Sequence, residues 1–286
     1  MRLLSFSEGG RESWGAVVGE VVVDLGKALP RYPTLADFIA SADYIRRNEI
    51  VSAVKPGPKL SEIRFLPVIP RPEKIICVVR NYLDHHNEAL ASGLKREITE
   101  YPPIFLRVWR SQVGHNEPII RPKVSDHLDW EGELAVVIGK AGRHISQADA
   151  WSHVAGYSIF NDVSVRDWQR HAQQIASGKN FVGTGPFGPW LVTPDNIGDP
   201  AKLKIETRVN GAVMQSSDTS MLIFPIPRLI EYCSTIFDLV PGDVVATGTP
   251  AGVGFARKPP IFLKPGDVVE VEIERIGVLR NPVVAE

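Results

Sequence analysis

The sequence has few cysteines and no long apolar stretch. Only two of its 286 residues are cysteine, Cys77 and Cys233, and they lie far apart without a C-x-x-C pair. This spacing indicates neither a disulfide framework nor a zinc ribbon and favours reduced, buried thiols. No apolar run reaches the roughly 18 residues that cross a bilayer, and the first residues lack the apolar core of a signal peptide. We therefore expect a soluble, cytoplasmic protein.

An excess of charge of one sign is also missing. The 32 basic and 33 acidic side chains give a formal net charge of −1, and no run of Lys and Arg forms a basic stripe. Neither nucleic acid nor a membrane is therefore expected as a partner. Hydrophobic residues make up 44% of the chain, as in ordinary globular proteins, so extended disorder is not expected.

Glycine and proline, by contrast, are plentiful and divide the chain into short apolar runs. The 24 Gly and 23 Pro predict many short strands joined by turns. Residues 1–69 predict a small N-terminal domain with a hairpin at 16–24 and helices near 34–42 and 44–53. A proline-rich segment ends near residue 70, and residues 70–286 predict a larger domain. We expect an α+β fold that is mostly β.

The larger domain holds further short elements, assigned from apolar periodicity and from bounding turn residues. Strands are expected at 75–79, 104–106, 118–120, 134–138, 156–161 and 268–276, and helices at 81–93, 148–154 and 226–236.

Three acidic residues suggest a metal site. Glu131 and Glu133 lie two apart at the start of an apolar strand, so their carboxylates point to one face. Two like charges on one face repel unless a cation lies between them, and an all-oxygen site suits Mg²⁺, Mn²⁺ or Ca²⁺. Solvated acids at a strand start are the alternative. Asp162, at the end of a second strand, is either a third ligand or a helix N-cap. If the segment after it is helical, Asp162, Arg166 and Gln169 share one face.

These segments resemble the signature of the fumarylacetoacetate hydrolase family. The resemblance runs from about residue 70 to the end, and its blocks occur in the family's order. They are IICVVRNYLDHHNE (75–88), EGELAVVIGK (131–140), GYSIFNDVSVRDWQ (156–169), GKNF (178–181), GPFGPWLVT (185–193), VNG (209–211) and TGTPAGVG (247–254).

The resemblance implies a fold, a metal site and an assembly. It implies a rolled mixed β-sheet domain, preceded by a small N-terminal domain and assembled as a homodimer. It implies Mg²⁺ or Mn²⁺ as the cofactor, with Ca²⁺ able to substitute. Its implied residues are the metal ligands Glu131, Glu133 and Asp162, the catalytic residues His85, Glu88 and Lys179, and the substrate contacts Arg166, Gln169 and Thr249.

The catalytic residues also have a physical reading. His85 and Glu88 are spaced i,i+3, so on a helix the carboxylate can orient the imidazole, and the pair can act as a general base. An ordinary surface pair is the alternative. Lys179 beside a metal and an enolate would add positive charge, and an ordinary surface lysine is the alternative.

One departure from the family pattern concerns the substrate. Where many relatives carry F-x-K-P, this chain has Arg107 and Val108. A planar, bidentate guanidinium recognises a carboxylate differently from an ammonium, so we expect Arg107 to contact the substrate and to alter substrate choice.

Three functions remain open at this stage. The first is a hydrolase that cleaves a C–C bond in an acylpyruvate-type 2,4-dioxo acid, as in the catabolism of aromatic compounds. The second is a decarboxylase or keto–enol isomerase acting on a small 2-oxo acid at the same site. The third is a binding module that kept the fold without catalysis.

Overall fold

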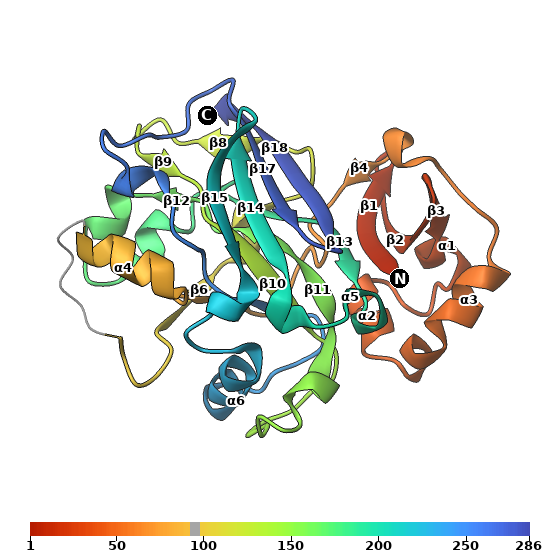
Figure 1. Cartoon of the computed structure of the whole chain (residues 1–286). Coiled ribbons are helices and arrows are strands. Elements are labelled where there is room, and N and C mark those ends of the chain that lie inside the picture. The colour runs from red at the N-terminus through yellow and green to blue at the C-terminus, as the bar shows by residue number, and fades with distance from the viewer. Residues whose placement is uncertain (92–97) are drawn as a thin grey trace.

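The computed structural model describes residues 1–91 and 98–286, and most of its regular structure is β-strand (Figure 1). The strands are β1 (Arg2–Glu8), β2 (Arg11–Val18), β3 (Val21–Asp24), β4 (Arg64–Phe65), β5 (Ile75–Val78), β6 (Ile104–Arg107), β7 (Gln112–Val113), β8 (Ile119–Arg121), β9 (Leu128–Asp129), β10 (Gly132–Ile138), β11 (Val154–Asn161), β12 (Ser164–Val165), β13 (Gly185–Val192), β14 (Lys204–Val209), β15 (Ala212–Asp218), β16 (Val244–Ala246), β17 (Val268–Ile273) and β18 (Gly277–Ala285).

The helices are short and lie between the strands. The α-helices are α1 (Leu25–Ala28), α2 (Leu35–Ile39), α3 (Arg47–Ala53), α4 (Leu83–Ala91), α5 (Pro194–Ile197) and α6 (Ile226–Ile236). Single 3₁₀ turns that matter below are η4 (Ala150–His153), η5 (Trp168–Arg170) and η6 (Ile175–Gly178).

The strands of the described residues form a large sheet, a second sheet and a two-stranded ribbon. The eleven-stranded sheet has the order β3-β2-β1-β13-β11-β10-β16-β5-β6, with β4 beside β1 and β7 beside β13. The five-stranded sheet has the order β15-β14-β17-β18-β8, and β12 pairs with β9. Pairs β16–β5, β18–β8 and β13–β7 are parallel and the others antiparallel, so the sheets are mixed. The expected α+β, mostly β class is confirmed.

Strand β10 is buried on both faces, which explains its unbroken apolar sequence. Leu134, Val136 and Ile138 belong to the core that reaches the five-stranded sheet. Ala135 and Val137 face the opposite core, which includes residues of α2. The period of two along the strand therefore separates two cores. Glu131, just before the strand, and Glu133, at its start, share the odd-numbered face.

The N-terminal residues extend the large sheet. Strand β1 pairs with β13, where Arg2 lies opposite Val192 and Leu3 opposite Leu191. Helix α2 begins at a capping box in which Thr34 and Asp37 bond each other's backbone N–H groups. Its buried Phe38 stacks on Trp14 of β2, with ring centroids 4.8 Å apart. In Figure 1 this part occupies one side of the molecule, and the division into domains 1–69 and 70–286 stays a prediction.

Several elements lie where the sequence placed them. Helix α6 spans 226–236 as expected, and β2 and β3 form the expected hairpin. The helix expected at 148–154 is instead the 3₁₀ turn η4. The helix expected at 81–93 is α4, and Gly93, its expected stop, lies outside the described residues. No helix in the described part of the chain is long and apolar enough to cross a membrane.

Candidate functional site

Glu131, Glu133 and Asp162 meet at the ends of two neighbouring strands. Gly132 of β10 lies opposite Asn161 of β11, so Glu131 and Asp162 are cross-strand neighbours, and the Asp162 N–H donates to the Glu131 carbonyl at 2.8 Å. One carboxylate oxygen from each of the three acids lies within 4.8 Å of the others, and all three residues are buried. The period of two correctly predicted that Glu131 and Glu133 share a face.

The glycine between the two glutamates is required by the opposite face of β10. A Cβ atom at Gly132 would lie 2.3 Å from the Thr207 hydroxyl and 2.8 Å from Val271 of the five-stranded sheet. No larger residue fits there without moving that sheet. The sequence E-G-E thus combines two inward carboxylates with close contact between the sheets.

Two cations hold Glu131 in its charged form. Lys179 Nζ lies 2.8 Å from Glu131 Oε2 and 2.6 Å from Asp162 Oδ2, and Arg166 Nη1 lies 2.6 Å from Glu131 Oε1. Burial alone would raise the pKa of Glu131, but Lys179 and Arg166 outweigh it and lower that pKa to about 2. Burial likewise disfavours the Lys179 ammonium, yet Asp162 and Glu131 raise its pKa.

Glu133 has the opposite electrostatic environment. Burial, followed by the charges of Asp162 and Glu131, raises its pKa well above the usual value. The Gly248 N–H, which donates to Glu133 Oε2 at 2.8 Å, only partly offsets this effect. A divalent cation among the three carboxylates would remove the repulsion, and an all-oxygen donor set suits Mg²⁺ or Mn²⁺. The donors that this chain places here therefore fit such a cation.

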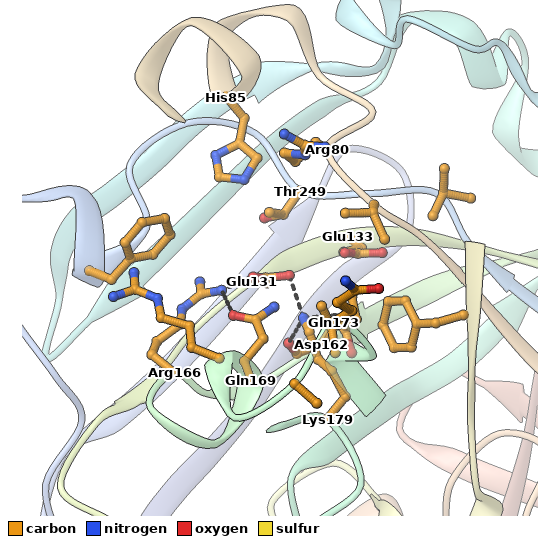
Figure 2. Close-up of a pocket in the computed structure, with 17 residues that line it drawn as sticks. Arg80, His85, Glu131, Glu133, Asp162, Arg166, Gln169, Gln173, Lys179 and Thr249 are labelled. Atoms are coloured by element: carbon orange, nitrogen blue, oxygen red, sulfur yellow. Dashed lines mark hydrogen bonds and ion pairs between the residues drawn. The ribbon is translucent and has the colours of Figure 1, made fainter. Parts of the chain in front are cut away.

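His85 and Glu88 lie one helical turn apart on α4, and His85 lines the cavity that holds the acid cluster. His85 Nδ1 is 3.0 Å from Glu88 Oε2, and the imidazole is 5% exposed. The other carboxylate oxygen of Glu88 accepts the Gly252 N–H at 2.9 Å, so Glu88 also ties α4 to loop 247–254. With Nδ1 occupied by Glu88, Nε2 is the ring atom left for a ligand, and Figure 2 shows His85 on the cavity wall across from the acid cluster.

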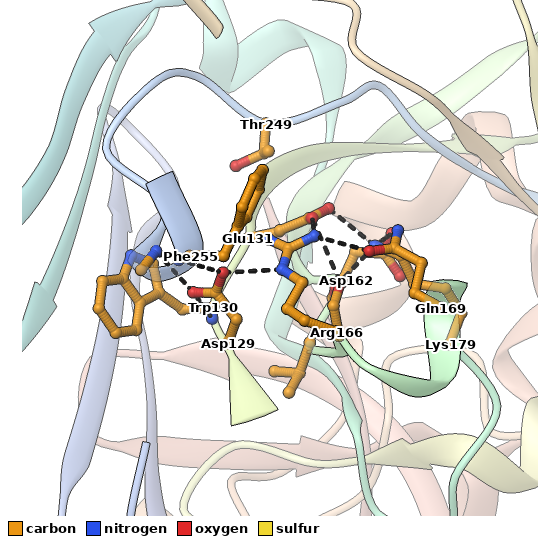
Figure 3. A network of polar contacts seen from close by, with 12 residues as sticks. Asp129, Trp130, Glu131, Asp162, Arg166, Gln169, Lys179, Thr249 and Phe255 are labelled. Carbon is orange, nitrogen blue, oxygen red and sulfur yellow. Dashed lines mark hydrogen bonds and ion pairs between the residues drawn. The ribbon is translucent and has the colours of Figure 1, made fainter. Parts of the chain in front are cut away.

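Asp129 anchors the guanidinium that borders the acid cluster (Figure 3). Asp129 is fully buried. Its carboxylate accepts hydrogen bonds from Arg166 Nε at 2.7 Å and from the N–H groups of Gly254 and Phe255 at 2.7 and 3.0 Å. Arg166 Nη1 also donates to Gln169 Oε1 at 3.1 Å. Asp129 thus fixes both Arg166 and the loop that faces it.

The segment after Asp162 is not helical, so the helical face that Asp162, Arg166 and Gln169 would have shared does not form. Ser164–Val165 forms β12, which pairs with β9, and only the short turn η5 follows. Asp162 caps no helix, because its backbone and side chain serve the strand end and the acid cluster. Arg166 and Gln169 nevertheless meet through their side chains.

Most of these groups line one cavity of about 410 Å³, and Glu88 and Asp129 are not among its lining residues. Its lining includes every predicted metal ligand and the predicted residues His85, Lys179, Arg166, Gln169 and Thr249. Such a size is typical of small-molecule sites, and the convergence of charged groups in it is typical of an active site.

Sequence comparison identifies the family. The family model described as "Fumarylacetoacetate (FAA) hydrolase C-terminal" matches residues 74–284. The chain belongs to the fumarylacetoacetate hydrolase family. The protein named oxaloacetate tautomerase FAHD2A, mitochondrial, of Bos taurus is 44% identical over 272 residues, which cover 93% of this chain and 85% of the relative.

Solved structures of the fumarylacetoacetate hydrolase fold agree over the whole chain. A putative HpcE protein from Mycobacterium smegmatis is 36% identical with a TM-score of 0.87, covering 100% of this chain and 99% of the other. Maleylpyruvate hydrolase from Sphingobium sp. SYK-6, in complex with manganese(II) ion and pyruvate, is 26% identical with a TM-score of 0.82 and the same coverage. The expected rolled mixed-sheet fold of this family is confirmed.

Arg107, the predicted substrate contact, is buried beside the acid cluster. It is 3% exposed and is not among the residues that line the cavity. Its Nη1 lies 2.6 Å from Asp162 Oδ1, and its Nη2 donates to Thr184 at 2.9 Å. The guanidinium therefore orients Asp162 from within the protein, and a substrate contact by Arg107 stays a prediction.

Thr249 lines the cavity, but its hydroxyl is already used by the protein. It donates to the Gly132 carbonyl at 2.9 Å and accepts Gln215 Nε2 at 2.8 Å. These bonds fix loop 247–254 against the start of β10. A substrate contact by Thr249 stays a prediction.

The sequence reading missed several residues of the site. Asp129 precedes Glu131 by two, so the same period of two that selected the glutamates could have selected it. Arg80 lies two residues after the buried strand β5, where site residues are commonly presented, and its φ of 51° is rare for a non-glycine residue. Arg170 and Phe255 carry no local signal, since loops bring them to the cavity.

Proposed function

We propose that the chain is a divalent-metal-dependent tautomerase that interconverts the keto and enol forms of oxaloacetate. The observation that carries the choice of reaction is the 44% identity, over 93% of this chain, to a protein named oxaloacetate tautomerase. The geometry supports it, because one cavity holds a base, a carboxylate cluster and cationic donors for an anionic substrate. This is the isomerase alternative of the sequence reading.

The cation site would be Glu131, Glu133 and Asp162, with Mg²⁺ or Mn²⁺ as the occupant. A cation bound there would polarise the 2-oxo group of the substrate and so acidify the protons on C3. Lys179 and Arg107 keep the ligand oxygens in place through their bonds to Asp162. Arg166 presents a guanidinium edge to the cavity for a substrate carboxylate.

His85 is the proton carrier in this proposal. Nε2 removes a proton from C3 of the keto acid, and Glu88 stabilises the resulting imidazolium through Nδ1 at 3.0 Å. The same nitrogen returns the proton to the C2 oxygen, which gives the enol. The reverse sequence gives the keto form, and no proton is gained or lost overall.

A second function, C–C bond hydrolysis of an acylpyruvate-type acid, has its own support. The structure of maleylpyruvate hydrolase with manganese(II) and pyruvate matches the whole chain with a TM-score of 0.82. In that reaction His85 and Glu88 would take a proton from water instead of from carbon. Homodimer assembly and the cytoplasmic location also stay predictions.

A product assay separates these functions. The purified chain with Mg²⁺ or Mn²⁺ receives enol oxaloacetate, acetylpyruvate or fumarylpyruvate, and enol absorbance, pyruvate and carbon dioxide are followed together. The proposal expects accelerated loss of enol absorbance without carbon dioxide release. Pyruvate plus a carboxylic acid from a dioxo acid, with no acceleration of enol decay, would replace it with the hydrolase function. Release of carbon dioxide at the rate of enol loss would replace it with a decarboxylase.

A further inference from the structure

Arg166 has a buried donor that the protein leaves without a partner. Its side chain is 6% exposed, Nε bonds Asp129, and Nη1 bonds Glu131 and Gln169. Nη2 is buried and has no hydrogen-bond partner within residues 1–91 and 98–286. A buried donor without an acceptor destabilises the folded protein. We therefore expect a ligand in the cavity that Arg166 lines to supply the acceptor for Nη2.

A second guanidinium lies beside it on the same aromatic ring. Arg166 Cζ is 4.5 Å from the ring centroid of Phe255, and Arg170 Cζ is 5.5 Å from that centroid. Arg170 is exposed and lines the cavity, and no acidic side chain pairs with it in the described part of the chain. Two neighbouring guanidinium groups then share one wall of the cavity, and an anion between them would relieve their mutual repulsion.

We propose that Arg170, together with Nη2 of Arg166 and the ring of Phe255, forms a second carboxylate subsite beside the acid cluster. It selects dicarboxylates over monocarboxylates of the same 2-oxo or 2-hydroxy acid type. Arg166 Nη1 contacts Glu131, and Nη2 of the same guanidinium belongs to the subsite, so the subsite lies next to the proposed cation ligands. A short substrate can therefore reach both ends. The inference rests on the proposed function for the assignment of the first carboxylate to the cation end.

The test compares two stable ligands that differ in the distal carboxylate. Malate and lactate share a 2-hydroxy acid end, and only malate carries a second carboxylate. Their affinities for the Mn²⁺-loaded protein are measured by calorimetry, without turnover. We expect the intact protein to bind malate more tightly than lactate. Arg170→Gln should lower malate affinity roughly fivefold, because an exposed ion pair is lost, while lactate affinity changes less than about twofold.

Two further variants locate the effect. Arg143→Gln removes an exposed arginine that pairs with Asp238 outside the cavity lining, and it should leave the malate-to-lactate ratio unchanged. Arg80→Gln removes another guanidinium of the same cavity. A ratio that falls in Arg80→Gln and not in Arg170→Gln would overturn the subsite, as would an intact protein that binds both ligands equally.

The binding readout also separates this inference from the proposed function. If Arg170→Gln abolishes the preference for malate but the intact protein does not accelerate enol decay, the subsite is supported and the tautomerase proposal is excluded. If the intact protein accelerates enol decay but Arg170→Gln leaves the ratio of malate to lactate affinity unchanged, the tautomerase proposal is supported and the subsite is excluded.

Discussion

Lys179 Nζ lies 2.6 Å from Asp162 Oδ2, and both side chains are 2% exposed. The ammonium also bonds Glu131 at 2.8 Å and the Asp162 carbonyl at 3.1 Å, so its three donors are all used. Lys179 is therefore a partner of the carboxylate cluster in this structure. Its position explains how several acids remain buried together.

Lys179→Met should destabilise the protein chiefly when no divalent cation is present. The change leaves two buried carboxylates short of positive charge, so the free energy of unfolding should fall by about 3 kcal/mol in chelator. Added Mn²⁺ should restore part of the loss, because it supplies charge at the same place. Denaturant unfolding with EDTA and with Mn²⁺ measures both values. Lys140→Met, at an exposed position, is the control, and equal stability of the two variants in EDTA would contradict the assignment.

Asp129→Asn should be far more damaging than Asp126→Asn. Asp129 is buried and pairs with Arg166, so removing its charge should cost about 3–5 kcal/mol of unfolding free energy. The Asp126 side chain is 82% exposed in its pair with Arg121, so its loss should be barely measurable. Urea unfolding of both variants gives the comparison. Similar small losses in the two would show that the Asp129 network does not hold the loop.

His115 should make stability fall below neutral pH. Burial, followed by the charge of Arg280, lowers the pKa of His115 to about 4. A histidine whose pKa is lowered by folding stabilises the protein fully above its unfolded pKa of about 6.5, and this contribution is lost as the pH falls toward 4. Between pH 7 and pH 5 the loss should be about 2 kcal/mol. Urea unfolding of the intact protein and His115→Gln at both values checks this, since the variant should lack that part of the pH dependence.

His85→Gln should lower the turnover of enol oxaloacetate about 100-fold or more, because it removes the proposed proton carrier. His86→Gln is the matched control on the same helix, since His86 lines a separate small pocket. Initial rates of enol decay with saturating Mn²⁺ give the comparison. Equal rates in the two variants would exclude His85 as the proton carrier.

The sequence predicted best those features that depend on residues close together in the chain. The spacing of Glu131 and Glu133 on one strand placed both carboxylates together, because side-chain direction in a strand repeats every two residues. Helix α6 was also predictable, since its apolar residues recur with helical spacing and Pro227 lies in its first turn.

Residues that meet through tertiary folding were harder to predict. Arg107 was expected to contact the substrate, and its ion pair with Asp162, at the end of the paired strands β5 and β6, could not be foreseen from the sequence. Arg170 and Phe255 meet only because two distant loops converge, which no local pattern records. Whether a helix follows Asp162 was open from the sequence, and the pairing of β12 with β9 decided against it.

The most direct test of the account is the rate of enol oxaloacetate decay in the intact protein and in Glu133→Gln, measured as Mn²⁺ is titrated. Burial and the charges of Asp162 and Glu131 raise the pKa of Glu133, so a divalent cation in the cluster would relieve this carboxylate of repulsion. We predict a metal-dependent acceleration in the intact protein that Glu133→Gln loses, while the fold of the variant is kept. Equal acceleration in both proteins, or acceleration that persists in chelator, would contradict the account.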